Sequence, residues 1–181
     1  MTDPDPALPR SGAIVYGPDM SADALLSDFA HTLAAHGVRV GGVVQRNTRV
    51  EAGCAARMEL EDVATGRVIL ISQSLGAGSA ACRLDPQGLA EAAMVLRRAV
   101  DDRVDLLVVN KFSGQEAAGG GLADEMLLAL AEGVPLLTAV ATRHLDRWQT
   151  FTGGCADLLA PDPAALRNWW AGLSSPARTV P

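Results

Sequence analysis

The chain has 181 residues, a net charge of −6 and a composition that is 49% hydrophobic but only 4% aromatic. This length fits one well-buried domain, and the acidic balance argues against broad binding to nucleic acids or anionic membranes. No apolar run approaches the roughly 20 residues of a membrane span, and the acidic, Pro-rich beginning is unlike a signal peptide. The three cysteines are scattered and form no CxxC pair of the kind that binds zinc. We therefore expect a cytoplasmic protein without a membrane, nucleic-acid or metal partner.

The chain divides into a short leader, one domain and a short tail. We expect residues 1–11 to be a flexible leader, because prolines and aspartates supply little apolar surface, residues 12–175 to form a single α/β domain, and residues 176–181 to be a tail. The domain opens with a short apolar strand, Gly12–Tyr16, and continues as a helix that ends near Gly37. That helix carries an apolar stripe at helical spacing: Ala22, Leu25, Leu26, Phe29 and Leu33.

The middle of the domain departs from simple alternation of strands and helices. Val38–Gln45 is a predicted strand, and the next two segments, Arg57–Asp62 and Val68–Ser72, flank a Gly-containing turn that predicts an antiparallel hairpin. Asp85-Pro86 then opens an amphipathic helix. The remaining predicted elements are, in chain order, the buried strand Val104–Val109, the helix Leu122–Glu132, a strand that ends at Val140, and the helices Arg143–Phe151 and Pro163–Leu173.

This order of elements predicts the fold class. Strands that alternate with helices form mostly parallel sheets, with right-handed crossovers and helices on both faces. We therefore expect an α/β domain with three layers, a mostly parallel sheet and one antiparallel hairpin insertion. In such a sheet the carboxyl ends of the strands face the ligand crevice, so the residues after each strand are the first candidates for a site.

The turn after the first strand has the outline of a phosphate-binding loop. In GxxxxGK[ST] loops the glycines expose backbone N–H groups, the Lys neutralises the phosphates and the hydroxyl holds Mg²⁺. Counted from Gly17, Ala22 stands in the position of the second glycine, Asp23 in that of the Lys and Ala24 in that of the Ser or Thr. Because an Asp repels a triphosphate, we do not expect ATP or GTP with Mg²⁺ as a cofactor, although backbone N–H groups at the helix start could still hold an anion.

Several segments resemble a known family in their order and spacing. GVRVGGVVQR (Gly37–Arg46), LEDVATGRVILIS (Leu60–Ser72), LLVVNKFSGQEA (Leu106–Ala117) and GVPLLTAV (Gly133–Val140) are similar to the THEP-type nucleoside triphosphatases, a P-loop family. The GVVQR, LEDxATG, CRLD (Cys82–Asp85) and NKF…QEA elements resemble still more closely a bacterial family of unknown function. These resemblances imply a fold of P-loop NTPase type and, through the genes that accompany the second family, a link to molybdenum uptake and use.

The departures from the THEP-type pattern fall at residues that phosphoryl transfer needs. The THEP-type enzymes carry an acidic pair after the central strand, where this chain has Asn110 and Lys111, whereas Glu116 matches their retained Glu. Loss of a carboxylate on the Mg²⁺ side, together with loss of the loop Lys, removes most of the groups used in phosphoryl transfer. Because both sites have changed together, the sequence favours an altered ligand.

We expect the altered site to bind a small anion such as molybdate or another oxyanion. Lys111 and Arg46 end predicted strands and Arg83 precedes a helix, so together they would form a cationic cleft for an oxyanion or carboxylate. Glu116 is the candidate orienting carboxylate, and the candidate catalytic residue if the protein is an enzyme. The other predicted ligand-binding residues are backbone donors of the loop and hydrogen-bonding neighbours: Gly17, Pro18, Asp19, Met20, Ser21, Ser72 and Gln73.

Three functions remain open at this point. The first is a non-hydrolysing protein of P-loop-like fold that binds a small anion and acts in molybdate or related metal-oxyanion handling. The second is a residual nucleoside triphosphatase, in which Lys111 replaces the loop Lys and Glu116 orients water. The third is a scaffold or regulator with a vestigial site that acts through homo-oligomers, which the apolar-rich composition favours.

Overall fold

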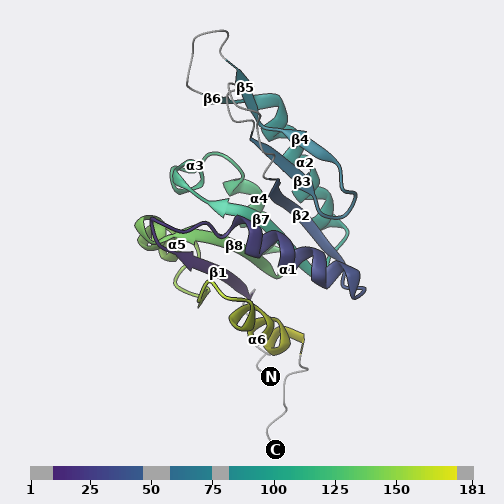
Figure 1. Ribbon diagram of the computed structural model, residues 1–181, viewed down its shortest axis with the longest axis vertical. Coiled ribbons are helices and arrows are strands. Elements are labelled where there is room, and N and C mark those ends of the chain that lie inside the picture. Colours follow the sequence, from purple (N-terminus) through teal and green to yellow (C-terminus); the bar gives the residue numbers. More distant parts are fainter. Residues whose placement is uncertain (1–9, 47–57, 75–81, 175–181) are drawn as a thin grey trace, which may run out of the picture.

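The computed structural model describes residues 10–46, 58–74 and 82–174 (Figure 1). In this part of the chain one sheet has seven strands, in the spatial order β4 (Val68–Leu70), β3 (Glu59–Asp62), β2 (Val40–Arg46), β7 (Leu106–Phe112), β8 (Leu136–Ala141), β1 (Ser11–Tyr16) and β9 (Asp157–Leu159). Neighbouring strands from β2 to β9 are parallel, whereas β3 runs antiparallel to both β2 and β4. The predicted sheet with its antiparallel hairpin insertion is confirmed.

Helices cover both faces of the sheet, so the fold has three layers (Figure 1). The helices that contribute to the two cores are α2 (Pro86–Asp101), α4 (Ala123–Ala131) and α5 (Leu145–Phe151) on one face, and α1 (Asp23–Ala35) and α6 (Pro163–Ser174) on the other. Side chains along β7 alternate between these faces, because successive residues of a strand point to opposite sides. Leu107 packs with the first group of helices and Val108 with the second.

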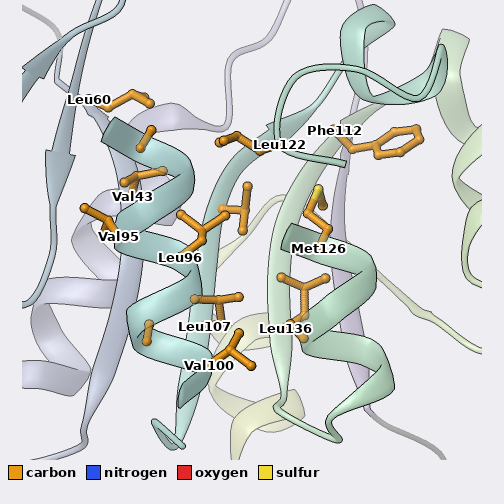
Figure 2. Close-up of a cluster of buried hydrophobic side chains, with 14 of the residues drawn as sticks. Val43, Leu60, Val95, Leu96, Val100, Leu107, Phe112, Leu122, Met126 and Leu136 are labelled. Atoms are coloured by element: carbon orange, nitrogen blue, oxygen red, sulfur yellow. The ribbon is translucent and has the colours of Figure 1, made fainter. Parts of the chain in front are cut away.

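The core between the sheet and helices α2 and α4 is mostly aliphatic, and Phe112 also belongs to it (Figure 2). Its side chains, each at most 8% exposed, include Val43, Leu60, Val95, Leu96, Val100, Leu107, Leu122, Met126 and Leu136. Burial of one such side chain contributes about 1.5–3 kcal/mol. This packing fixes β2 and β7 against the two helices and therefore holds the ends of both strands in place.

Two aspartates fix the hairpin and the start of α2. The carboxylate of Asp62 accepts hydrogen bonds from Ala64 N at 3.0 Å and Thr65 Oγ1 at 2.7 Å, which closes the predicted turn. Asp85 accepts a hydrogen bond from Gln87 N at 3.0 Å and caps α2, whose first residue is a proline. Proline is tolerated there because the first N–H groups of a helix have no helical partner.

Some element boundaries differ from the sequence-based expectation. β1 begins at Ser11, the expected end of the leader, because Ser11 is buried and pairs with Leu136 in β8. The predicted strand Val68–Ser72 divides after Leu70. Its second part belongs to a separate two-stranded sheet that consists of β5 (Ser72–Ser74) and β6 (Cys82–Leu84).

Short elements also appear near the ends of β7 and β8. The four-residue helix α3 (Gly114–Ala117) follows β7, and a 3-10 helix, η1 (Thr142–His144), leads from β8 into α5. Most of the predicted leader and the predicted tail, residues 1–9 and 175–181, lie outside the described residues. Among the described helices, none combines the length and the apolar character that crossing a membrane requires.

Candidate functional site

The carboxyl ends of β1, β2, β7 and β8 lie along one edge of the sheet, as expected for parallel strands. One pocket at this edge, which we call the loop pocket, has a volume of about 380 Å³ and is lined by Tyr16, Gly17, Pro18, Ala141, Thr142 and Arg143. A second pocket, which we call the amide pocket after Gln45 and Asn110, has a volume of about 260 Å³. It lies between the hairpin side of the sheet and the turn that follows β7.

An ion pair joins the start of α1 to the end of β7. Asp23 is the first residue of α1 and is only 8% exposed, and its Oδ1 lies 3.9 Å from Nζ of Lys111. Lys111 has a left-handed backbone, with φ at +40°, where the register of β7 with β8 shifts between Val109 and Phe112. The positive charge of the predicted anion-binding Lys111 is therefore matched within the protein by Asp23.

Arg143 supplies the cationic side chain of the loop pocket and was not among the predicted site residues. It lies two residues after the end of β8 at Ala141, and Lys111 is likewise close to the end of β7, so its position shortly after a predicted strand was a usable signal. Burial raises the pKa of Tyr16, the carboxylate of Asp23 raises it further, and the guanidinium of Arg143 acts in the opposite direction. The three side chains therefore share one electrostatic environment.

The loop between β1 and α1 is exposed from Pro18 to Ser21. Met20 N donates a hydrogen bond to Gly17 O at 3.2 Å, which closes a turn, and Ser21 Oγ accepts one from Asp23 N at 3.3 Å. Proline has no N–H group. Pro18 and Met20 therefore offer no free backbone donor to a ligand, which narrows the predicted set of donors in this loop.

Glu116 is buried, and both oxygens of its carboxylate accept hydrogen bonds from the chain. Oε2 accepts from Ser113 N at 3.0 Å and from Ser113 Oγ at 2.6 Å, and Oε1 accepts from Leu122 N at 3.2 Å. Gly121 approaches this carboxylate so closely that a side chain there would collide with it. These contacts, a capping box at α3, close the turn between β7 and α4. The orienting or catalytic role of Glu116 stays a prediction.

The polar part of the amide pocket's lining consists of Gln45, Asn110, Lys111, Ser113, Gln115 and Glu116, and the amides of Gln45 and Asn110 are paired. Asn110 is 9% exposed, and its Nδ2 donates a hydrogen bond to Gln45 Oε1 at 3.0 Å. Asn110 Oδ1 is buried and has no hydrogen-bond partner in the described part of the chain. A buried acceptor left without a donor costs about 1–3 kcal/mol. Neither residue was predicted to bind a ligand.

Two further predicted residues, Arg46 and Ser72, are not among the described residues that line the two pockets. Arg46 is exposed at the end of β2, opposite Glu59 of β3. Ser72 is buried, and its hydroxyl accepts a hydrogen bond from a backbone N–H at 2.9 Å. Gln73 and Arg83 are backbone partners in the β5–β6 sheet. Among the described residues, no group of three or more His, Cys, Asp or Glu side chains could hold a metal ion.

The sequence and the fold both have known relatives. The chain is 46% identical over 166 residues to the "Molybdenum import ATP-binding protein ModC 2" of Bradyrhizobium diazoefficiens, and the alignment covers 92% of this chain but 18% of that protein. In structure it is similar to THEP1 from the hyperthermophile Aquifex aeolicus, with a TM-score of 0.59 and 13% identity over 90% of this chain and 96% of that one. This likeness shows a P-loop NTPase-like fold, in agreement with the sequence. Residues 12–169 match the model of the family described as "Protein of unknown function (DUF2478)", and the chain therefore belongs to that family.

Proposed function

We propose that this chain is a non-hydrolysing domain of P-loop-like fold that binds a small anion and acts in the cytoplasm in the handling of molybdate or a related metal oxyanion. The observation that carries the proposal is the ion pair between Asp23 and Lys111, next to a pocket with a cation of its own, Arg143. The ion pair argues against phosphoryl transfer, and the pocket offers a place for the anion.

The ion pair disfavours nucleoside triphosphates. Where a phosphate-binding loop has its Lys, this chain has the buried carboxylate of Asp23. Because Asp23 and Lys111 compensate each other, the start of α1 offers a triphosphate no net positive charge, whereas a phosphate-binding loop supplies a Lys and Mg²⁺ there. Lys111 does not replace the missing cation, because it already lies 3.9 Å from Asp23. Binding without hydrolysis is therefore favoured over residual triphosphatase activity.

The loop pocket suits a compact oxyanion. Arg143 supplies a guanidinium group, which can donate two parallel hydrogen bonds to an oxyanion. The hydroxyls of Thr142 and Tyr16 add donors on the same lining. Since Lys111 offsets the charge of Asp23, the negative charge at the start of α1 is matched before a ligand arrives.

The choice of molybdate is supported by one relative. The Bradyrhizobium protein is named as a molybdenum import ATP-binding protein, and this chain matches 18% of its length. In the proposal, the segment shared with that protein responds to the oxyanion and does not bind ATP.

Isothermal titration calorimetry of the purified chain with molybdate, tungstate, sulfate, phosphate, and ATP or GTP with Mg²⁺ tests this function. We expect molybdate or tungstate to bind and the nucleotides not to bind. Arg143→Gln should weaken oxyanion binding about tenfold or more, since a hydrogen bond to a charged group contributes about 1.5–3 kcal/mol. Arg147→Gln, on the exposed side of α5, is the matched control and should leave binding unchanged.

The same titrations distinguish the other hypotheses. Loss of binding in Lys111→Ala, with unchanged binding in Arg143→Gln, would move the anion from the loop pocket to Lys111. Nucleotide binding with phosphate release that disappears in Glu116→Gln, while circular dichroism shows that the variant is still folded, would establish a residual triphosphatase. A stable oligomer in native mass spectrometry, without a response to any of these compounds, would favour the scaffold.

A further inference from the structure

We propose that the amide pocket binds a compact, neutral ring compound with a lactam edge, that is, a cyclic amide whose N–H and C=O groups lie side by side. The paired amides of Gln45 and Asn110 belong to the polar part of the pocket's lining, and most of the lining surface is apolar. It is separate from the loop pocket, and this proposal does not depend on anion binding there.

Asn110 provides a buried acceptor that lacks a donor. Its side chain lines the pocket and is held in place by the 3.0 Å hydrogen bond from Nδ2 to Gln45 Oε1. Its Oδ1 has no partner among the described residues, although the residue is only 9% exposed. Most buried polar side-chain atoms in proteins have a partner. In the proposal, the N–H of the bound ligand reaches Oδ1 and satisfies this atom.

Gln45 provides the complementary donor. Because Gln45 Oε1 accepts from Asn110, the Nε2 group on the other arm of the same amide is the atom that can donate to a ligand carbonyl. A lactam presents a donor and an acceptor next to each other and matches Asn110 Oδ1 and Gln45 Nε2. With both amides rotated by half a turn, Asn110 presents the donor and Gln45 the acceptor, and a lactam still matches.

The charges that border the pocket are compensated within the protein. Lys111 pairs with Asp23, and the carboxylate of Glu116 accepts hydrogen bonds from Ser113 and Leu122. A charged ligand would lose its hydration shell and would find no uncompensated opposite charge in the pocket. Burial of such an unpaired charge is costly. The pocket therefore favours a neutral ligand.

The walls and the volume limit the size of the ligand. The apolar part of the lining consists of Met58, Leu60, Ile71, Leu84, Leu89 and Leu122. The volume of about 260 Å³ lies below the range typical of pockets for drug-sized ligands, about 300–1,000 Å³. A flat compound with one or two rings satisfies both limits, whereas a nucleotide, with its charge and its sugar, does not.

An NMR titration of the ¹⁵N-labelled full chain tests the proposal. The probes are 2-pyridone and hypoxanthine, and their counterparts without the carbonyl are pyridine and purine. We expect at least one lactam to shift the side-chain amide signals of Asn110 and Gln45 and to bind at least tenfold more tightly than its counterpart. Equal affinities within both pairs, or no binding of either lactam at millimolar concentration, would overturn the proposal.

A matched pair of variants tests the same contact from the side of the protein. Asn110→Leu removes the amide but keeps a similar side-chain volume, and should weaken lactam binding at least tenfold. Asn168→Leu, on the exposed face of α6, makes the same change away from the pocket and should leave binding unchanged. Equal binding in both variants would also overturn the proposal, and the titration of the unaltered chain remains decisive if Asn110→Leu does not fold. Loss of the lactam site leaves the molybdate titration unaffected, so the two proposals can fail separately.

Discussion

The turn after β7 and the loop after β1 border two pockets at one edge of the sheet, yet they hold their polar groups differently. In the turn after β7, the carboxylate of Glu116 is buried and accepts hydrogen bonds from Ser113 and Leu122. The loop after β1 is exposed from Pro18 to Ser21, and the guanidinium of Arg143 lines the pocket beside it. The wall of the amide pocket is therefore held by hydrogen bonds, and the charge of Glu116 in it is compensated. The loop pocket has an exposed loop on one side and the cationic side chain of Arg143.

The ion pair between Asp23 and Lys111 relates the surroundings of the two pockets. Lys111 lines the amide pocket, and the carboxylate of Asp23 acts on Tyr16, which lines the loop pocket. In phosphoryl-transfer enzymes with a P-loop, the start of the helix carries the cation and the end of the strand carries the carboxylate. Here the two signs are exchanged. Opposite charges still attract after such an exchange, so the two elements stay joined, and in our proposal the site takes a different ligand.

The largest expected effect belongs to the turn after β7. Glu116→Ala should lower the free energy of unfolding by about 2–4 kcal/mol, because it leaves the donors of Ser113 and Leu122 without their acceptor. Urea unfolding followed by circular dichroism measures this loss.

The matched control is Glu132→Ala, which removes an exposed carboxylate that lies 3.4 Å from Arg103. A surface ion pair of this kind contributes about 0–1 kcal/mol, so the control should change stability little. Equal losses in the two variants would contradict the view that Glu116 holds the turn.

Much of the fold could be predicted because it depends on local chemical signals. The hairpin follows from apolar segments on both sides of a turn that contains Gly66, and the start of α2 follows from Asp85-Pro86. The position of Glu116 also had a local signal, since Ser113 and Glu116 have the S-x-x-E spacing of a capping box. That spacing indicates a structural carboxylate more directly than a ligand-binding one.

The contacts at the site could not be predicted in the same way. Asp23 and Lys111 are far apart in sequence, and their contact depends on the order of the strands and on the left-handed backbone of Lys111, for which the residue type gives no signal. The pairing of Asn110 with Gln45 depends likewise on β2 and β7 being neighbours. The sequence pattern predicts which residues end strands but does not determine which strands adjoin. The sequence pattern therefore indicates which edge of the sheet carries the candidate site. It does not indicate which side chains pair with each other there.

A smaller effect is expected at the ion pair that joins the two pockets. The side chains of Lys111 and Asp23 are 33% and 12% exposed, so this ion pair is partly buried. An exposed ion pair contributes about 0.2–1 kcal/mol to stability, and breaking a buried one costs about 3–5 kcal/mol. We expect the contribution of this pair to lie between these two values. Asp23→Asn and Lys111→Met should each lower the free energy of unfolding by about 1–2 kcal/mol, and the double variant should lose about 1 kcal/mol less than the sum.

The exchange of signs itself can be tested in the same cycle. Asp23→Lys alone places two cations together and should be more destabilising than Asp23→Asn, and a second change, Lys111→Asp, should restore part of the loss. Strictly additive losses, measured by thermal unfolding, would mean that the contact at 3.9 Å does not contribute to stability.

The smallest expected effect is a change in the titration of Tyr16, which is the single tyrosine of the chain. Burial and, after it, the carboxylate of Asp23 raise the pKa of Tyr16, and Arg143 lowers it. Asp23→Asn should therefore lower this pKa and Arg143→Gln should raise it, as measured by tyrosinate absorbance against pH. Arg147→Gln is the control in which the pKa should not change. Because the pKa is raised in the folded state, the associated stability is present below the unfolded pKa of about 10 and is lost as the pH rises through the folded pKa.

The same titration distinguishes the two pockets when ligands are present. An oxyanion bound in the loop pocket places a negative charge near Tyr16 and should raise its pKa further, because a nearby anion disfavours the phenolate. A neutral lactam in the amide pocket adds no charge and should leave the pKa of Tyr16 where it is. Molybdate that binds without moving this pKa would lie away from Tyr16, and the loop pocket would then lose its assignment as the anion site. A lactam that changes the pKa of Tyr16 would show that the two pockets are coupled through Lys111 and Asp23. The two pockets would then have to be treated as one continuous site.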